Sequence, residues 1–168
     1  YYLVTPNPSP MKPLEQWFDE YAVSHRNETN KAIHYICVPA IFFSIVGLLM
    51  SIPPFFLEGL FSGIFILENW ATLALVFVLL FYFRLSFSMG MKMLVFAVLC
   101  ILGNYFISTI APLWLVSVVI FVMAWIGQFY GHKLEGAKPS FLKDIQFLLI
   151  GPAWVIENLF RGQRTVEL

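Results

Sequence analysis

The chain has 168 residues, of which 60% are hydrophobic and only 12% charged, and its mean hydropathy is +0.79. Soluble domains are about 45–50% apolar and about 25% charged, so this composition indicates a membrane protein rather than a soluble one. The formal net charge is zero, which gives no indication of a nucleic-acid partner.

The first ten residues are polar and rich in proline, so we interpret residues 1–10 as an N-terminal extension and residues 11–168 as a single membrane domain. The following segment predicts a short amphipathic helix, with Ser9 as its cap and Pro10 at its first position. Its apolar residues recur at three- and four-residue steps and therefore share one face. They are Leu14, Trp17, Phe18 and Tyr21, and His25 falls on the same face.

Four apolar stretches are long enough, or nearly so, to cross a hydrocarbon core of about 30 Å, which takes about 20 helical residues. They cover residues 33–52, 64–83, 92–110 and 113–130. The breaks between them are short, which predicts an antiparallel bundle. Asn104, inside the third stretch, is expected to form a hydrogen bond between helices.

A fifth apolar run covers residues 141–160, but it contains charged residues and a break at Gly151-Pro152. We therefore expect an interfacial or partly inserted helix that is kinked at the proline. The predicted fold is an all-α integral membrane protein. It is a four-transmembrane-helix bundle with an N-terminal amphipathic helix and a C-terminal interfacial helix.

The basic residues predict the orientation. With four spans, all ten lysines and arginines fall on one side of the membrane, and the loops on the other side contain none. Because basic residues concentrate in cytoplasmic loops, both termini of this multi-pass protein are expected in the cytoplasm.

All three histidines lie in two polar clusters at the cytoplasmic ends of the predicted spans, His25 and His34 in residues 24–34 and His132 in residues 128–135. Nine residues in one straight helix would place His25 and His34 on opposite faces, so they converge only if the chain turns between them. Residues 27–30 are typical of a turn, with Asn30 the expected cap of the first span.

Three neutral imidazoles near a carboxylate suit Fe(II) or Zn(II), and open coordination positions suit an oxygenase. His132 shares a helix face with Gln128 and with Glu135, which lie four residues before it and three after it. The candidate ligands are His25, His34, His132 and, as a fourth, Glu135. The polar residues expected around them are Asn27, Asn30 and Gln128, and the candidate contacts to a substrate head group are Arg26, Lys31 and Lys133.

Several alternatives stay open at this stage. The asparagines could simply be caps, Glu135 could pair with Lys133 or Lys138, and the basic residues are explained by the membrane orientation. A non-enzymatic scaffold or transport subunit with a histidine metal site is one alternative function. A haem held by His34 and His132 is another. Cys37 and Cys100 are expected to be buried, reduced thiols.

The two polar clusters resemble the Mpo-type 2-hydroxy fatty acid dioxygenases of fatty acid alpha-oxidation. The resemblance rests on Ser24-His25-x-Asn27-x-x-Asn30-x-x-Ile33-His34, on Gln128-x-x-Gly131-His132-x-x-Glu135, and on Leu149 to Pro152. It implies an integral membrane enzyme, in the endoplasmic reticulum of eukaryotes or the inner membrane of bacteria. It also implies Fe(II) held by His25, His34 and His132, with O2 and a long-chain 2-hydroxy fatty acid as substrates. The expected reaction shortens the acid by one carbon and releases CO2.

Overall fold

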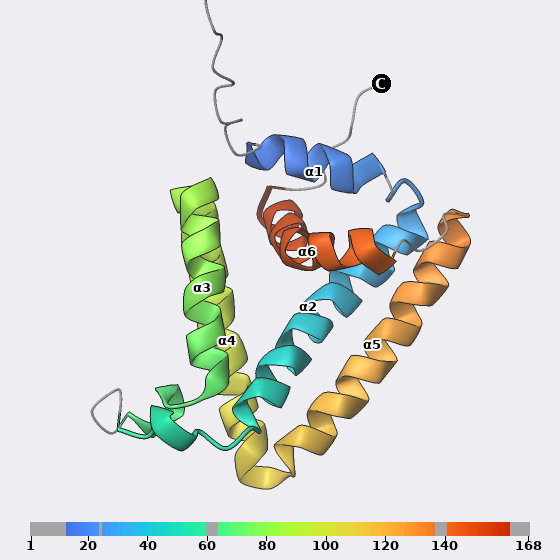
Figure 1. Cartoon of the computed structure of the whole chain (residues 1–168). Helices are drawn as coiled ribbons and strands as arrows, with labels where there is room; N and C mark the ends of the chain where they lie inside the picture. The colour runs from blue at the N-terminus through green and yellow to red at the C-terminus, as the bar shows by residue number, and fades with distance from the viewer. Residues whose placement is uncertain (1–12, 24, 60–63, 137–140, 162–168) are drawn as a thin grey trace, which may run out of the picture.

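The computed structural model describes residues 13–23, 25–59, 64–136 and 141–161 (Figure 1). The expected extension over residues 1–10, with its cap at Ser9, lies outside these ranges. The described residues are helical and contain no strand. The helices are α1 (Leu14–Val23), α2 (Glu28–Met50), α3 (Trp70–Leu85), α4 (Phe87–Ile110), α5 (Leu113–Glu135) and α6 (Phe141–Arg161). Two short 3-10 turns, Phe55–Leu57 and Phe65–Leu67, lie between α2 and α3.

Three of these helices are long and apolar enough to cross a membrane, namely α2, α4 and α5, with 23, 24 and 23 residues. The second predicted span is different, because residues 64–69 are not part of its helix. The Asn69 side chain accepts a hydrogen bond from the backbone N–H of Thr72 at 3.0 Å and starts α3 only at Trp70. With 16 residues, α3 is about 24 Å long, which is shorter than a hydrocarbon core. The four-span bundle is therefore confirmed only as three candidate spans and one shorter apolar helix.

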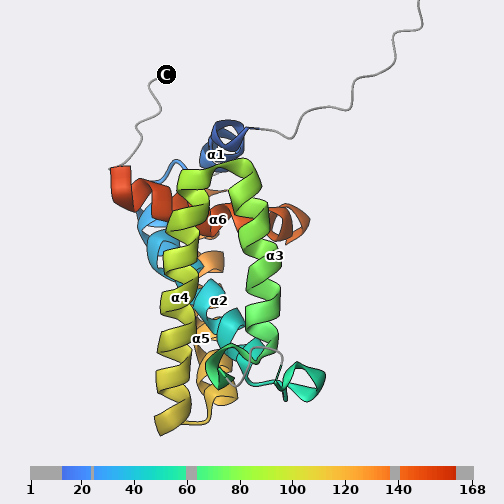
Figure 2. The ribbon, with the colours of Figure 1, turned by 90° about the vertical axis from the view of Figure 1, so that its left-hand side faces the viewer.

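The long helices form two antiparallel pairs (Figures 1 and 2). In one pair α2 lies along α5, and in the other α3 lies along α4. The connection between α3 and α4 lies at the same end of the molecule as α1 and α6, and the start of α2 and the end of α5 lie at this end too. Arg26, Lys31, Arg84, Lys92 and Lys133 are therefore at this end, as the orientation argument requires.

The first span begins earlier than expected. Asn27, not Asn30, caps α2, because its side-chain oxygen accepts hydrogen bonds from the backbone N–H groups of Thr29 and Asn30 at 2.9 and 3.2 Å. The predicted cap at Asn30 is therefore wrong. An asparagine oxygen at either position could accept from the next free N–H groups, so local sequence could not decide between them. Because Asn27 provides the cap, the Asn30 side chain is available for a tertiary contact.

Part of the C-terminal helix α6 is buried against other helices. Every residue from Ile150 to Asn158 is buried, and α6 passes between α1 and α2 (Figure 1). Phe18 and Tyr21 of α1 are only 5% exposed, so the amphipathic face expected for this helix is confirmed by its burial in the core. Lys92 of α4 donates to Glu157 of α6 at 2.6 Å. The expected interfacial position of this helix stays a prediction, since Leu159 and Phe160 at its end are 66% and 73% exposed.

A polar contact joins α2, α4 and α5 in the middle of the bundle. Asn104 donates to the carbonyl of Phe43 at 3.0 Å, which confirms the expected hydrogen bond between helices. Asn104 and Ser117 are 0% and 1% exposed and both lie against Gly47. The absence of a side chain at Gly47 is what permits this close approach.

Gly47→Ala is therefore expected to destabilise the protein. An added Cβ would lie 2.2 Å from Ser117 Oγ and 2.3 Å from Asn104 Oδ1, so the helices must separate. We expect a loss of about 1–3 kcal/mol in the free energy of unfolding, measured in detergent micelles. Gly103→Ala is the control, since its Cβ meets only the ring of Phe43, which can turn away. Equal stability of the Gly47→Ala variant and the wild type would contradict this packing argument.

Candidate metal centre

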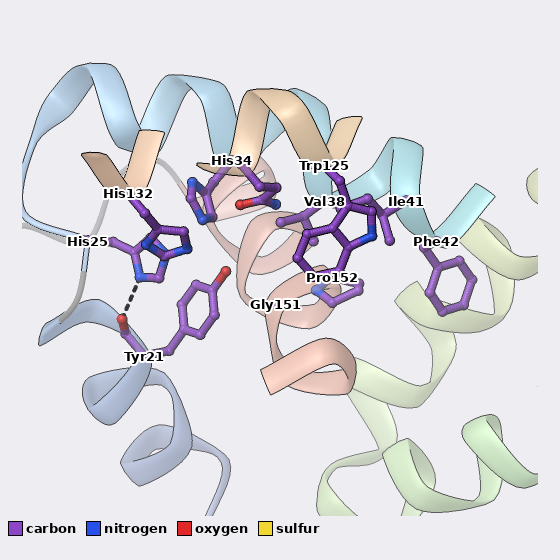
Figure 3. Close-up of a pocket in the computed structure, with 11 residues that line it drawn as sticks. Tyr21, His25, His34, Val38, Ile41, Phe42, Trp125, His132, Gly151 and Pro152 are labelled. Atoms are coloured by element: carbon purple, nitrogen blue, oxygen red, sulfur yellow. Dashed lines mark hydrogen bonds between the residues drawn. The ribbon is translucent and has the colours of Figure 1, made fainter. Parts of the chain in front are cut away.

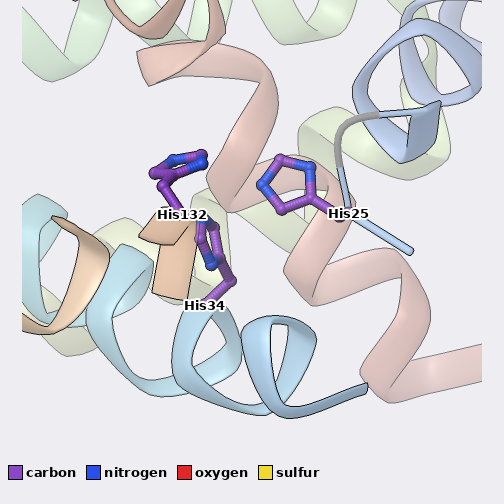
Figure 4. Close-up of side chains that lie close together, drawn as sticks. All are labelled: His25, His34 and His132. Atoms are coloured by element: carbon purple, nitrogen blue, oxygen red, sulfur yellow. The ribbon is translucent and has the colours of Figure 1, made fainter. Parts of the chain in front are cut away.

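Three different elements bring the histidines together. His25 lies in the link between α1 and α2, His34 lies in the second turn of α2, and His132 lies in the last turn of α5. Their ring centroids are 4.3 Å (His25–His34), 5.0 Å (His34–His132) and 5.7 Å (His25–His132) apart. The three rings gather around one point (Figure 4). One nitrogen from each lies within 4.8 Å of the others, and all three residues are buried.

Backbone carbonyls orient two of the imidazoles. Nδ1 of His25 lies 2.7 Å from the carbonyl oxygen of Tyr21, and Nδ1 of His34 lies 2.9 Å from that of Asn30. A carbonyl oxygen can only accept, so Nδ1 carries the proton and Nε2 keeps its lone pair. A second-nitrogen hydrogen bond of this kind is typical of metal-bound histidines.

The free nitrogens fit a metal ion. Nε2 of His25 is buried and has no hydrogen-bond partner in the described part of the chain. Burying an acceptor without a hydrogen-bond partner raises the free energy of the folded protein unless a ligand binds to that acceptor. Metal–nitrogen distances are about 2.0–2.1 Å, so small side-chain movements would let the three imidazoles share one ion. The donor set therefore fits a metal such as Fe(II) or Zn(II).

The electrostatic surroundings favour neutral imidazole. Burial lowers the pKa of His25 to about 4. The ring of Tyr21 stacks on that of His25 at 4.2 Å and shields it from water. His25 is therefore uncharged at neutral pH, and neutral imidazole is the form that binds metals.

Glu135 ties the end of α5 to the link before α2. One carboxylate oxygen accepts from the backbone N–H of Arg26 at 2.8 Å. The other accepts from the backbone N–H of Asn27 at 3.0 Å and from Nδ2 of Asn30 at 2.9 Å. Among the described residues, the mutually close ligand atoms come from the histidines and do not include Glu135. We call this set of three hydrogen bonds the Glu135 clasp.

The Glu135 clasp touches all three histidine positions. Arg26 directly follows His25, the Asn30 carbonyl orients His34, and Glu135 lies three residues after His132. The Asn30 side chain packs closely on Gly131, where an added Cβ would lie 2.4 Å from Asn30 Oδ1. The glycine before His132 is therefore what lets Asn30 reach the end of α5.

A cavity of about 50 Å³ lies beside the imidazoles (Figure 3). At one end it is lined by His25, His34 and His132, and it continues along an apolar wall of α2. The remaining lining residues are Tyr21, Val38, Ile41, Phe42, Trp125, Gln128, Gly151 and Pro152. One end of the cavity therefore offers metal ligands, while the other suits hydrocarbon.

The sequence-based site residues divide into three groups. Gln128 lines the cavity. Asn27, the cap of α2, and Asn30, in its first turn, both belong to the Glu135 clasp. The basic candidates lie elsewhere, since Arg26 and Lys133 are exposed and Lys31 pairs with Glu28 at 2.8 Å. None of these three lines the cavity.

Sequence reasoning missed Tyr21, Trp125 and the α6 residues as parts of the site. Tyr21 was visible only as one member of the apolar face of α1. Gly151 and Pro152 were noted as a break in the last apolar run and as part of the resemblance. Only the packing of α6 beneath α1 shows that they line a cavity.

Fold and site together define an all-helical protein of membrane type, with a buried group of three histidines that could hold a metal ion. The model of the family described as "2-hydroxy-palmitic acid dioxygenase Mpo1-like" matches residues 11–163, so the chain belongs to the Mpo1-like family. No curated protein and no solved structure shows a significant similarity to the chain. The family name implies dioxygenase activity in lipid metabolism.

Proposed function

We propose that this protein is an Fe(II)-dependent dioxygenase that shortens long-chain 2-hydroxy fatty acids by one carbon. The overall reaction consumes one O2 and yields the shorter acid, CO2 and water, so that all atoms balance. The observation that carries the proposal is the buried group of three imidazoles, two of them with Nδ1 held by a carbonyl. The family membership supports the substrate class.

In this proposal His25, His34 and His132 hold the iron. When bound, Fe(II) would supply the redox chemistry with O2 and a Lewis acid for the substrate oxygens. The carbonyls of Tyr21 and Asn30 keep the protons on Nδ1, so that Nε2 can act as the ligand. The Glu135 clasp positions the histidines, and burial excludes bulk water from the reacting groups.

The shape of the cavity suits a fatty acid whose head group enters first. The head would lie against the imidazoles, and the first part of the tail would follow Val38, Ile41 and Phe42. The remainder of a long chain exceeds a space of about 50 Å³ and would continue among the apolar residues of the bundle and the lipid. We propose that the site opens at the cytoplasmic face, where the basic residues concentrate.

Metal analysis of anaerobically purified protein tests the proposal. After Fe(II) is supplied in detergent, we expect about one iron per chain, as a single buried trio of imidazoles requires. Addition of O2 and 2-hydroxyhexadecanoate should then yield pentadecanoate, detected by mass spectrometry. Failure to retain any metal would instead favour the non-enzymatic scaffold or transport subunit. A Soret band in the absorption spectrum of the purified protein would instead indicate the haem alternative.

A further inference from the structure

Gln128 is a further polar residue at the same cavity. It lies on α5, one helical turn before His132, and is only 6% exposed. Its side chain lines the cavity. Within the described ranges no protein group forms a hydrogen bond with this amide, whereas Asn27 Oδ1 accepts from the backbone N–H of Thr29 and Asn30 Nδ2 donates to Glu135.

The amide of Gln128 is open to the cavity, since in the described part of the chain its atoms are not among the buried polar atoms without a hydrogen-bond partner. Burial of an amide without hydrogen bonds is unfavourable, so such groups are completed by protein, water or a bound molecule. The backbone of α5 is satisfied by its own helix, and Val38, Ile41 and Phe42 of the cavity wall are apolar. Trp125 also lines the cavity, and its Nε1 is buried without a partner in the described part of the chain. Water or a molecule bound in the cavity can therefore supply the hydrogen-bond partner of the Gln128 amide.

The charges of the lining side chains limit which chemical groups can bind in the cavity. Among the described residues no lysine or arginine lines it, so a carboxylate entering it meets no cationic side chain from this part of the chain. Apart from the metal, its negative charge would be stabilised by neutral donors. A hydrogen bond to an ionised acceptor is about twice as strong as a neutral one, which makes an amide N–H2 a suitable donor here.

The amide also has an acceptor beside its donor. A 2-hydroxy acid carries a carboxylate acceptor and a hydroxyl donor on adjacent carbon atoms. The two groups are complementary, since N–H2 can donate to the carboxylate while C=O accepts from the hydroxyl. An acid without the 2-hydroxyl would leave the amide oxygen unpaired.

We propose that Gln128 is a substrate-binding residue that recognises the 2-hydroxy carboxylate head and selects it over an unhydroxylated acid. The inference rests on the proposed function, because it assumes that the head group lies beside the three histidines. It assigns to this chain a specificity determinant on α5, four residues before a metal ligand.

Anaerobic binding measurements test this assignment without turnover. Calorimetry on the iron-loaded protein would give the affinities for 2-hydroxyhexadecanoate and hexadecanoate. Gln128→Met keeps the volume but removes both hydrogen bonds, so we expect affinity for the hydroxy acid to fall about 10–100-fold. The preference for the hydroxy acid should shrink, because the unhydroxylated acid loses only one of the two bonds. Iron content should stay at the wild-type level.

Two further variants sharpen the test. Gln128→Glu has the same size but places a carboxylate beside the substrate carboxylate, so it should weaken binding of both acids. Gln16→Met is the matched control, since Gln16 is exposed on α1, and it should bind like the wild type.

The outcomes separate the two proposals. Unchanged affinity and preference in Gln128→Met, with iron bound, would overturn the role of Gln128 and leave the proposed function standing. A wild-type protein that holds iron and binds neither acid would overturn the proposed substrate, and the assignment of Gln128 with it. Loss of iron from Gln128→Met and Gln128→Glu would show a role in holding the metal centre and would also overturn substrate recognition.

Discussion

Replacement of His34 by alanine is expected to remove bound iron and to bring turnover of the 2-hydroxy acid below detection. His34 is 1% exposed, and its ring lies next to both of the others, 4.3 Å from His25 and 5.0 Å from His132. Loss of a residue that only orients a ligand costs about 10–100-fold in metal affinity, so loss of a ligand should cost more. Metal content after desalting and product formation are the two measurements.

Loss of iron in His34→Ala indicates loss of a ligand only if the variant still folds. His34→Ala leaves a space in the wall between α2 and α5, so His34→Gln, which fills more of that space, should be compared with it. Ile36→Ala is the matched control, because Ile36 lies two residues further along α2 and is 73% exposed. Helix content and detergent-solubilised size should be unchanged in all three. Iron retained by both His34 variants at the wild-type level would contradict the assignment of this ligand.

Glu135→Gln is expected to lower iron affinity by about 10–100-fold while leaving a protein that can still be loaded at high Fe(II) concentration. Glu135 accepts three hydrogen bonds, two of them from the backbone next to His25. An amide has one oxygen instead of two, and its N–H2 group would face the donor of Arg26 or of Asn27. The link would move and take His25 away from the other two imidazoles. Titration of the apoprotein with Fe(II) measures the effect.

The control for Glu135 is a carboxylate outside the clasp. Glu28 pairs with Lys31 at 2.8 Å and is 70% exposed, so Glu28→Gln should leave iron affinity unchanged, as expected for a surface ion pair. The size of the loss in iron affinity in Glu135→Gln distinguishes two roles for Glu135. A loss as complete as that in His34→Ala would indicate a direct ligand, whereas no loss at all would contradict the clasp.

Several parts of the fold could be predicted from local pattern. The starts of α5 and α6 agree with the sequence, because the proline at Pro112 and the apolar run from Phe141 are strong signals. The start of α3 does not agree, because a capping asparagine inside an apolar run outweighs hydropathy. The cap of α2 was misplaced by three residues, since two asparagines of the same chemistry compete there.

The sequence by itself determined that the chain is helical and of membrane type, and that its three histidines form one candidate site. These conclusions follow from composition, apolar runs and spacing, which are local properties. Only the tertiary structure decided how closely His132 approaches His25 and His34, that Glu135 clasps the link before α2, and that α6 lines the cavity. Those features depend on contacts between residues more than one hundred positions apart, such as Arg26 and Glu135, and no local pattern specifies them.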